Sequence, residues 1–253
     1  MRRLAAVLVS AALAAIPGAT PAAAEDVALR PAPIPALARH AATVEAFIPA
    51  GFELESQSAG DLNQDGRTDR VLVLRGRDPS LVISDPTYLS RLDTNPRLLA
   101  VLMSAPGGGY DLAARSADLI PRQADPNAFD YLEDGGVSVE QGVVRLSLQI
   151  WSGAGPQWWK SFGFIWRDGR LRLASYSETV FNRGSGESDT LTVNYLSGVA
   201  ERVLENDFTD APARSRHRRF ARRTLIPLEA VGDGVVFNPR VPTVVIPQGR
   251  TGG

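Results

Sequence analysis

The feature that most constrains the fold is a strict alternation of apolar side chains in the middle of the chain. Apolar residues occupy every second position in two successive runs, first Val144, Leu146, Leu148 and Ile150, and then Phe162, Phe164 and Trp166. A period of two places side chains on one face of a β-strand, whereas a helix requires a period of 3.6. Asp168-Gly169 is typical of a two-residue hairpin turn, and Leu171 and Leu173 begin a returning strand. The sequence therefore predicts an antiparallel meander here.

Shorter runs predict more strands on both sides of this meander. We expect strands at residues 71–74, a hairpin of 97–103 and 110–114 across a glycine-rich turn, a hairpin of 190–195 and 199–204, and a last strand at 223–228. No unit of 20 to 50 residues repeats, which disfavours a propeller or a solenoid. The predicted class is mostly β, a single antiparallel meander or sandwich-like domain with one or two short helices, with α+β as the alternative.

The amino terminus predicts export. Residues 1–24 contain Arg2 and Arg3, an apolar stretch at 4–16, and three small residues, Ala22 to Ala24, before Glu25. This is the pattern of a cleaved signal peptide. The chain has no cysteine for a lipid anchor, and no later stretch approaches about 18 apolar residues, so we expect no membrane span. The predicted location is the periplasm or the extracellular space.

Residues 25–50 read as a proline-rich arm followed by a short helix. Prolines at 31, 33 and 35 favour extended backbone. The helix is predicted from an apolar stripe at helical spacing, ended by Pro49 and Gly51, whose members are Ile34, Leu37, Ala41, Val44 and Ile48. We expect residues 51–230 to form a β-rich domain and residues 231–253 an extended carboxy-terminal arm.

Composition excludes several classes of protein. The chain has 27 basic and 28 acidic residues, two histidines and no cysteine. This excludes a disulfide scaffold, a thiol enzyme and a cysteine-ligated metal site, and it disfavours a nucleic-acid binder, which needs a clear basic excess.

One segment carries a chemical motif. Residues 61–69 place oxygen-bearing side chains at positions 1, 3, 5 and 9 of a loop, with glycine at position 6. Calcium prefers six to eight oxygen ligands, and such spacing brings alternate side chains to one point. We therefore predict a structural Ca²⁺ site held by side-chain oxygens of four residues and the backbone carbonyl of a fifth: Asp61, Asn63, Asp65, Asp69 and, through its carbonyl, Arg67. The alternative is a turn without metal, because Asp, Asn and Gly are common turn residues.

An EF-hand would require glutamate at position 12, but that position is Leu72. The loop instead resembles the aspartate-rich loop of FG-GAP and related extracellular calcium modules, in which a strand follows the final aspartate. Further motifs at 47–52, 95–99, 164–166 and 194–198 make residues 45–205 similar to a family of bacterial exported proteins and lipoproteins that carry a single such loop. The resemblance implies one β-rich domain and no established activity. This chain departs from many relatives in lacking the lipid-anchor cysteine.

Three weaker features remain. Trp151, Trp158 and Trp159 flank a short loop and form a candidate ligand platform, with capping of the sheet edge as the alternative. The arginine run from 214 to 223 predicts a solvated segment rather than an anion-binding one. Asp130, Glu133 and Asp134 predict a small solvated acidic turn rather than a second metal site.

These features lead to one prediction of function with one alternative. We expect an exported, soluble calcium-binding β domain that serves as a binding or envelope-associated module, with an envelope polysaccharide or protein as partner. The alternative is a carbohydrate-active hydrolase that uses a carboxylate pair. The sequence singles out no catalytic residue.

Overall fold

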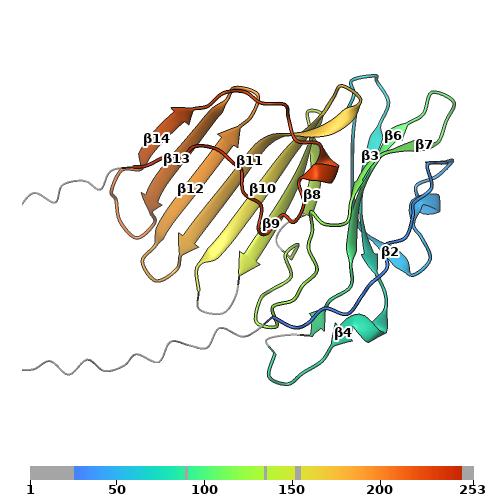
Figure 1. Cartoon of the computed structure of the whole chain (residues 1–253), viewed down its shortest axis with the longest axis horizontal. Coiled ribbons are helices and arrows are strands. Elements are labelled where there is room, and N and C mark those ends of the chain that lie inside the picture. Colours follow the sequence, from blue (N-terminus) through green and yellow to red (C-terminus); the bar gives the residue numbers. More distant parts are fainter. Residues whose placement is uncertain (1–25, 89–90, 134–135, 152–154, 247–253) are drawn as a thin grey trace, which may run out of the picture.

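The structure is a computed structural model that describes residues 26–88, 91–133, 136–151 and 155–246. It contains two large antiparallel sheets, which Figure 1 shows side by side, and a two-stranded ribbon of β4 (Val82–Ile83) and β5 (Leu92–Asp93). The first sheet has the order β1-β7-β6-β3-β2, with β1 (His40–Ala41), β2 (Phe52–Gly60), β3 (Asp69–Gly76), β6 (Arg97–Ser104) and β7 (Tyr110–Ser116).

The second sheet is a continuous meander of seven consecutive strands. These are β8 (Gly136–Glu140), β9 (Val143–Trp151), β10 (Gln157–Arg167), β11 (Arg170–Asn182), β12 (Glu187–Asn194), β13 (Val199–Asn206) and β14 (Arg214–Arg219). The only helical elements in the described residues are three 3₁₀ turns, η1 (Glu45–Phe47), η2 (Pro79–Leu81) and η3 (Leu228–Ala230). The mostly β, antiparallel class is confirmed.

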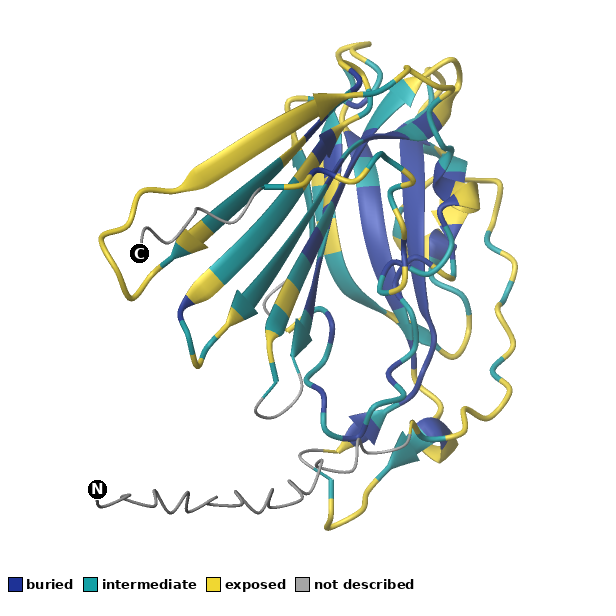
Figure 2. Cartoon of the chain, turned by 60° about the vertical axis from the view of Figure 1, so that its left-hand side comes forward, coloured by how far each residue is buried: buried dark blue, intermediate teal, exposed yellow. Residues whose placement is uncertain are grey.

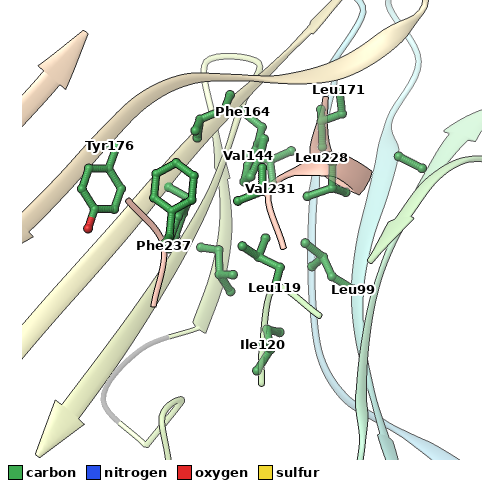
Figure 3. Packing of buried hydrophobic residues seen from close by; sticks show 14 of the residues in the cluster. Leu99, Leu119, Ile120, Val144, Phe164, Leu171, Tyr176, Leu228, Val231 and Phe237 are labelled. Carbon is green, nitrogen blue, oxygen red and sulfur yellow. The ribbon is translucent and has the colours of Figure 1, made fainter. Parts of the chain in front are cut away.

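The central meander forms as the alternation predicted. Asp168 and Gly169 both have positive φ, 52° and 70°, as a primed hairpin turn requires. The alternating apolar residues of β9 and β10 lie in the main core between the two sheets, together with Leu99 of β6 and Leu171 of β11 (Figure 3). At one side the sheets meet edge to edge, where the Val139 N–H of β8 donates to Ser58 Oγ of β2 at 2.9 Å. The result is a sandwich that is closed along its β2–β8 edge.

A second core lies on the outer face of the five-stranded sheet. Strands β3 and β6 are apolar at consecutive positions because both of their faces are buried. Leu72, Leu74, Leu98 and Leu102 of this face pack against Phe47 of η1, and residues from the segment 37–54 cover them.

The predicted helix across residues 34–48 is wrong. This segment is extended as far as β1, which pairs with β7, and its only helical part is the three-residue turn η1. Its apolar residues nevertheless face protein, since Leu37, Ala41, Val44 and Ile48 pack against the second core. The apolar spacing therefore predicted burial correctly and conformation incorrectly, because prolines hold the start of the segment extended and the sheet can bury an extended chain equally well.

The predicted strand at 223–228 is also wrong. The last strand of the described residues is β14, formed by the arginine run itself. Residues 223–228 lie outside any strand, and Pro227 makes an isolated bridge with Arg172. Every residue of β14 is exposed, as Figure 2 shows along its whole length. Charged residues on an edge strand are common because they discourage pairing with other chains.

Residues 231–246 cross the inner face of the seven-stranded sheet instead of projecting into solvent (Figure 1), and the rest of the predicted carboxy-terminal arm lies outside the described residues. Phe237 and Val244 are buried in the main core, and the Phe237 ring lies 5.3 Å from Phe162 and 5.1 Å from Tyr176. Side chains of the sheet hold its backbone: Tyr195 Oη donates to the Pro239 carbonyl at 3.1 Å, and Arg202 Nη1 to the Val244 carbonyl at 3.2 Å. This segment therefore completes the core where the smaller sheet does not reach.

The predicted signal peptide lies outside the described residues. Within the described ranges, no helix has the length and apolar character to cross a membrane.

Candidate functional site

The aspartate-rich loop joins β2 to β3 at the end of their hairpin. Gly60 and Asp69 are the last paired residues of the two strands, so the loop runs directly into β3, as predicted. Gln64 and Gly66 have positive φ, 60° and 83°. Glycine at position 66 adopts this conformation without strain, which allows the sharp bend.

The side chains at loop positions 1 and 3 point into the loop. Asp61 Oδ1 and Asn63 Oδ1 both accept the backbone N–H of Asp65, each at 3.1 Å. Asp61 Oδ2 accepts the Gly66 N–H at 2.8 Å. Two of the predicted calcium ligands therefore present oxygen atoms to the same backbone group.

Asp65, at position 5, is turned toward the same region but is also paired with a cation. Its Oδ1 accepts the Arg67 N–H at 2.9 Å, and its Oδ2 contacts Asn63 Nδ2 and the Arg67 guanidinium. Burial raises the pKa of Asp65, but the hydrogen bonds from Arg67 and Asn63 and the positive charge of Arg67 outweigh it and lower the pKa. The carboxylate is therefore ionised, as a calcium ligand must be, and Arg67 competes for it.

Asp69, at position 9, has a structural role. Its side chain is fully buried, with Oδ2 accepting the Leu62 N–H at 2.8 Å and Oδ1 accepting the Ser104 N–H at 2.9 Å. It thereby ties both ends of the loop to β6. Of the predicted side-chain ligands, the structure brings together Asp61, Asn63 and Asp65 and directs Asp69 to backbone donors. In the part of the chain that the structure describes, no three His, Cys, Asp or Glu residues cluster closely enough to hold a metal ion.

The three tryptophans do not share one surface. Alternate residues of β9 and β10, such as Leu148 and Phe162, face the main core, so Trp158 is on this inner face and Trp151 and Trp159 are on the outer face. Trp158 lies beyond the core and is 37% exposed. On the outer face, Trp151 stacks on Phe129 at 4.5 Å, and Trp159 lies 6.5 Å from Phe181.

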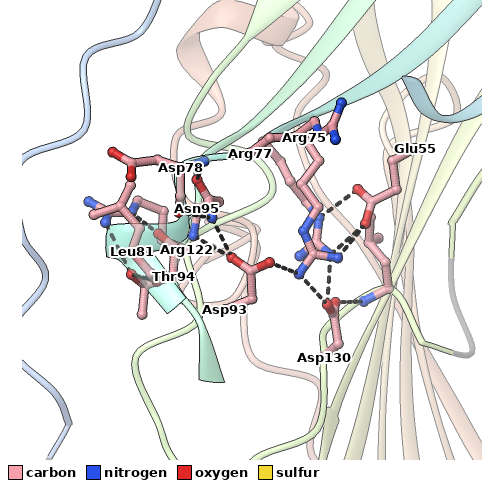
Figure 4. Close-up of polar contacts among 12 residues, drawn as sticks. Glu55, Arg75, Arg77, Asp78, Leu81, Asp93, Thr94, Asn95, Arg122 and Asp130 are labelled. Carbon is pink, nitrogen blue, oxygen red and sulfur yellow. Dashed lines mark hydrogen bonds and ion pairs between the residues drawn. The ribbon is translucent and has the colours of Figure 1, made fainter. Parts of the chain in front are cut away.

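A partly buried ion network lies at the other end of the β2–β3 hairpin, and no sequence pattern marks its members as partners (Figure 4). Arg97 of β6 is buried, with Nε and Nη2 each donating to Glu55 at 2.7 Å and Nη2 donating to Asp130 at 2.6 Å. Arg75 of β3 contacts Glu55 at 3.1 Å and Asp93 at 2.9 Å. Asp130 is therefore part of this network, and the prediction of a solvated acidic turn is wrong for this residue.

Asp130 of this network does not have the property that the general acid of a glycoside hydrolase requires. That reaction needs one carboxyl group that stays protonated as a general acid, so its pKa must be raised. Burial raises the pKa of Asp130, but the hydrogen bonds and charge of Arg97 outweigh it and lower the pKa. Elsewhere in the described residues, every carboxyl group whose pKa departs clearly from its ordinary value also moves downward. The hydrolase alternative gains no support.

Comparison with known proteins finds no matching family model, no similar curated protein and no similar solved structure. The resemblance to exported proteins with a single calcium loop therefore stays a prediction.

Proposed function

We propose that this chain is an exported β-sandwich module that takes up one Ca²⁺ ion in the loop 61–69 and binds an envelope polysaccharide or protein. The observation that carries the proposal is the convergence of the Asp61 and Asn63 oxygens on one backbone N–H, beside the ionised Asp65. Carboxylate and amide oxygens are the ligands that a hard cation prefers, and the ion would bind through lone pairs that the Asp65 N–H does not use. Water molecules would complete the coordination shell.

Arg67 provides an internal test of this proposal. In the structure its guanidinium contacts the Asp65 carboxylate. Calcium binding through Asp65 would have to displace this contact, so Arg67 weakens the site. Asp69 would hold the loop ends in place with or without the ion, because backbone donors already occupy both of its oxygens.

The test is the dependence of thermal stability on calcium. Extracellular sites of this kind have dissociation constants on the order of 10⁻⁴ to 10⁻³ M, so 10 mM Ca²⁺ should raise the melting temperature by roughly 3 to 6 °C. Asp65→Ala should abolish this rise. In Arg67→Gln, the rise in melting temperature between calcium-free and calcium-loaded protein should be larger than in the natural chain. Protein from the periplasmic fraction should be used, and its intact mass should correspond to a chain that begins at Glu25.

Asp85→Ala is the matched control. Asp85 also accepts a backbone N–H in an exposed turn, from Thr87 at 2.9 Å, but lies outside the loop. Its replacement should leave the calcium response unchanged. A melting temperature that does not respond to calcium, or an Asp65→Ala variant that responds like the natural chain, contradicts the proposed site.

For the ligand surface we propose the inner face around Trp158. An exposed indole near the end of an interior strand can stack on a flat sugar ring or an aromatic group. Trp151 and Trp159 are engaged with Phe129 and Phe181 on the opposite face, so they are weaker candidates.

A further inference from the structure

A depression of about 350 Å³ lies at the end of the β10–β11 hairpin, far along the chain from the aspartate-rich loop. Three separate parts of the sequence form its walls. They are the hairpin itself with Arg167, Asp168 and Arg172, the β12–β13 turn, and the segment 222–225 that follows β14. Its lining includes four arginines and a single carboxylate.

Arg172 has a fixed position in this depression. Its side chain is only 17% exposed, with Nη1 donating to the Leu225 carbonyl at 3.1 Å and Nε donating to the Arg167 carbonyl at 3.2 Å. Carbonyl oxygens orient a guanidinium group without cancelling its charge. Within the described part of the chain, the only carboxylate near it is Asp168, at 3.9 Å and 72% exposed, so water screens this pair.

Arg222 and Arg223 are brought to the same place by a close backbone contact. The Phe220 N–H donates to the Gly198 carbonyl at 2.8 Å, which fixes the segment after β14 against the β12–β13 turn. A side chain at Gly198 would lie 2.6 Å from the Phe220 carbonyl oxygen, so only glycine permits this approach. Both arginines are exposed, and no hydrogen bond or ion pair of either is found among the described residues.

The charge at this depression is unbalanced. Arg167, Arg172, Arg222 and Arg223 together with Asp168 give a formal charge of +3, in a chain whose overall charge is −1. We infer that the depression binds an oxyanion group of the phosphate or sulfate type. Guanidinium groups suit such a ligand because their planar fork donates two parallel hydrogen bonds to its oxygens.

The adjacent edge strand distinguishes two sources of this group. β14 leads toward the depression and carries Arg214, Arg216, Arg218 and Arg219. A free phosphate or sulfate ion would use the depression alone. A polymer that carries many such groups would also contact β14, and its affinity would fall more steeply with salt.

The test is titration calorimetry with inorganic phosphate, pyrophosphate and sulfate at constant ionic strength, with chloride as the reference anion. Saturable binding is expected, and Arg222→Gln combined with Arg223→Gln should weaken it by about tenfold. Both residues are exposed, so the variant should keep its fold, which circular dichroism can check. Arg145→Gln on β9 removes one exposed arginine charge elsewhere and should have no effect on affinity.

The second part of the test uses long-chain polyphosphate and dextran sulfate as ligands. If either binds more tightly than pyrophosphate and Arg216→Gln weakens only the polymer, the natural ligand is a polyanion. If Arg216→Gln changes neither, it is a small oxyanion. Two results would overturn the inference, because each would show only diffuse charge attraction. The first is the absence of saturable binding below about 10 mM, and the second is equal weakening by Arg145→Gln and by the double variant. None of these outcomes depends on calcium.

Discussion

Arg97 is a positive charge placed where only 4% of its side chain reaches solvent. Such a charge is tolerated when several hydrogen bonds and opposite charges surround it. Burial lowers the pKa of Arg97, but the hydrogen bonds and charges of Glu55 and Asp130 outweigh it and raise the pKa. Three elements are joined at this one guanidinium, namely β2, β6 and the chain that precedes β8.

Replacing Arg97 should therefore be costly. Arg97→Met leaves Glu55 and Asp130 without their shared partner in a partly buried position, and we expect it to lower the free energy of unfolding by about 3 kcal/mol. Arg77→Met is the matched control, because Arg77 pairs with Glu53 at the same end of the sheet but is 64% exposed. The control should change the free energy by less than about 1 kcal/mol. Urea denaturation measures both values, and equal losses would contradict this account of the network.

At the scale of elements, strand β10 presents two adjacent tryptophans to opposite faces of the sheet. Adjacent residues of a strand point to opposite faces, and neither indole is fully buried. Trp158 is on the core side yet lies beyond the region that the smaller sheet covers. The alternation therefore gives the face on which Trp158 lies but not its burial, because the smaller sheet does not cover the first residues of β10.

This arrangement predicts different effects of the two substitutions. Trp158→Ala should abolish binding to a soluble glycan while lowering stability by only about 1 kcal/mol, since much of its ring is already in water. Trp159→Ala should leave binding unchanged and cost about 2 kcal/mol through lost contact with Phe181. Fluorescence quenching by peptidoglycan fragments and by a neutral glucan, together with denaturation, reads out both effects. Binding that survives in Trp158→Ala argues against this surface.

At the scale of the whole molecule, the two sheets have unequal sizes, and the carboxy-terminal segment fills the difference. Tyr176 and Tyr195 lie where this segment crosses the larger sheet, and Tyr131 lies at the edge of the main core. Burial raises the pKa of Tyr131 to about 12, with a smaller contribution from nearby carboxylates such as Asp233. Burial likewise raises the pKa values of Tyr176 and Tyr195.

These tyrosines should make the fold sensitive to alkali. The unfolded chain releases the phenolic protons near pH 10, whereas the folded chain retains them. Their contribution to stability is thus complete below about pH 10 and is lost as the pH rises toward 12. We expect part of the tyrosinate absorbance to appear in one step together with loss of the circular dichroism signal, and Tyr131→Phe to make stability less dependent on pH above 10. Complete tyrosine ionisation before unfolding would refute this.

Features that depend only on neighbouring residues follow from the local sequence. The alternation in β9 and β10, the Asp168-Gly169 turn and the bend at Gly66 could all be predicted because each is set by local backbone preference and by a period of two. The helix at 34–48 could not be distinguished from an extended chain, since both bury the same apolar residues and only the sheet beneath decides between them.

Tertiary structure decided everything that joins distant positions. Arg97 meets Glu55 and Asp130, which lie 42 and 33 positions away, and no local pattern marks the three as partners. Arg172 and Arg222 line one depression only because Gly198 lets two turns touch. Asp69 has the spacing of a loop ligand, yet the backbone N–H of Ser104, which only the pairing of β3 with β6 brings close, takes one of its oxygens. A charged group pairs with the nearest hydrogen-bonding group or opposite charge, and the fold determines which groups are nearest.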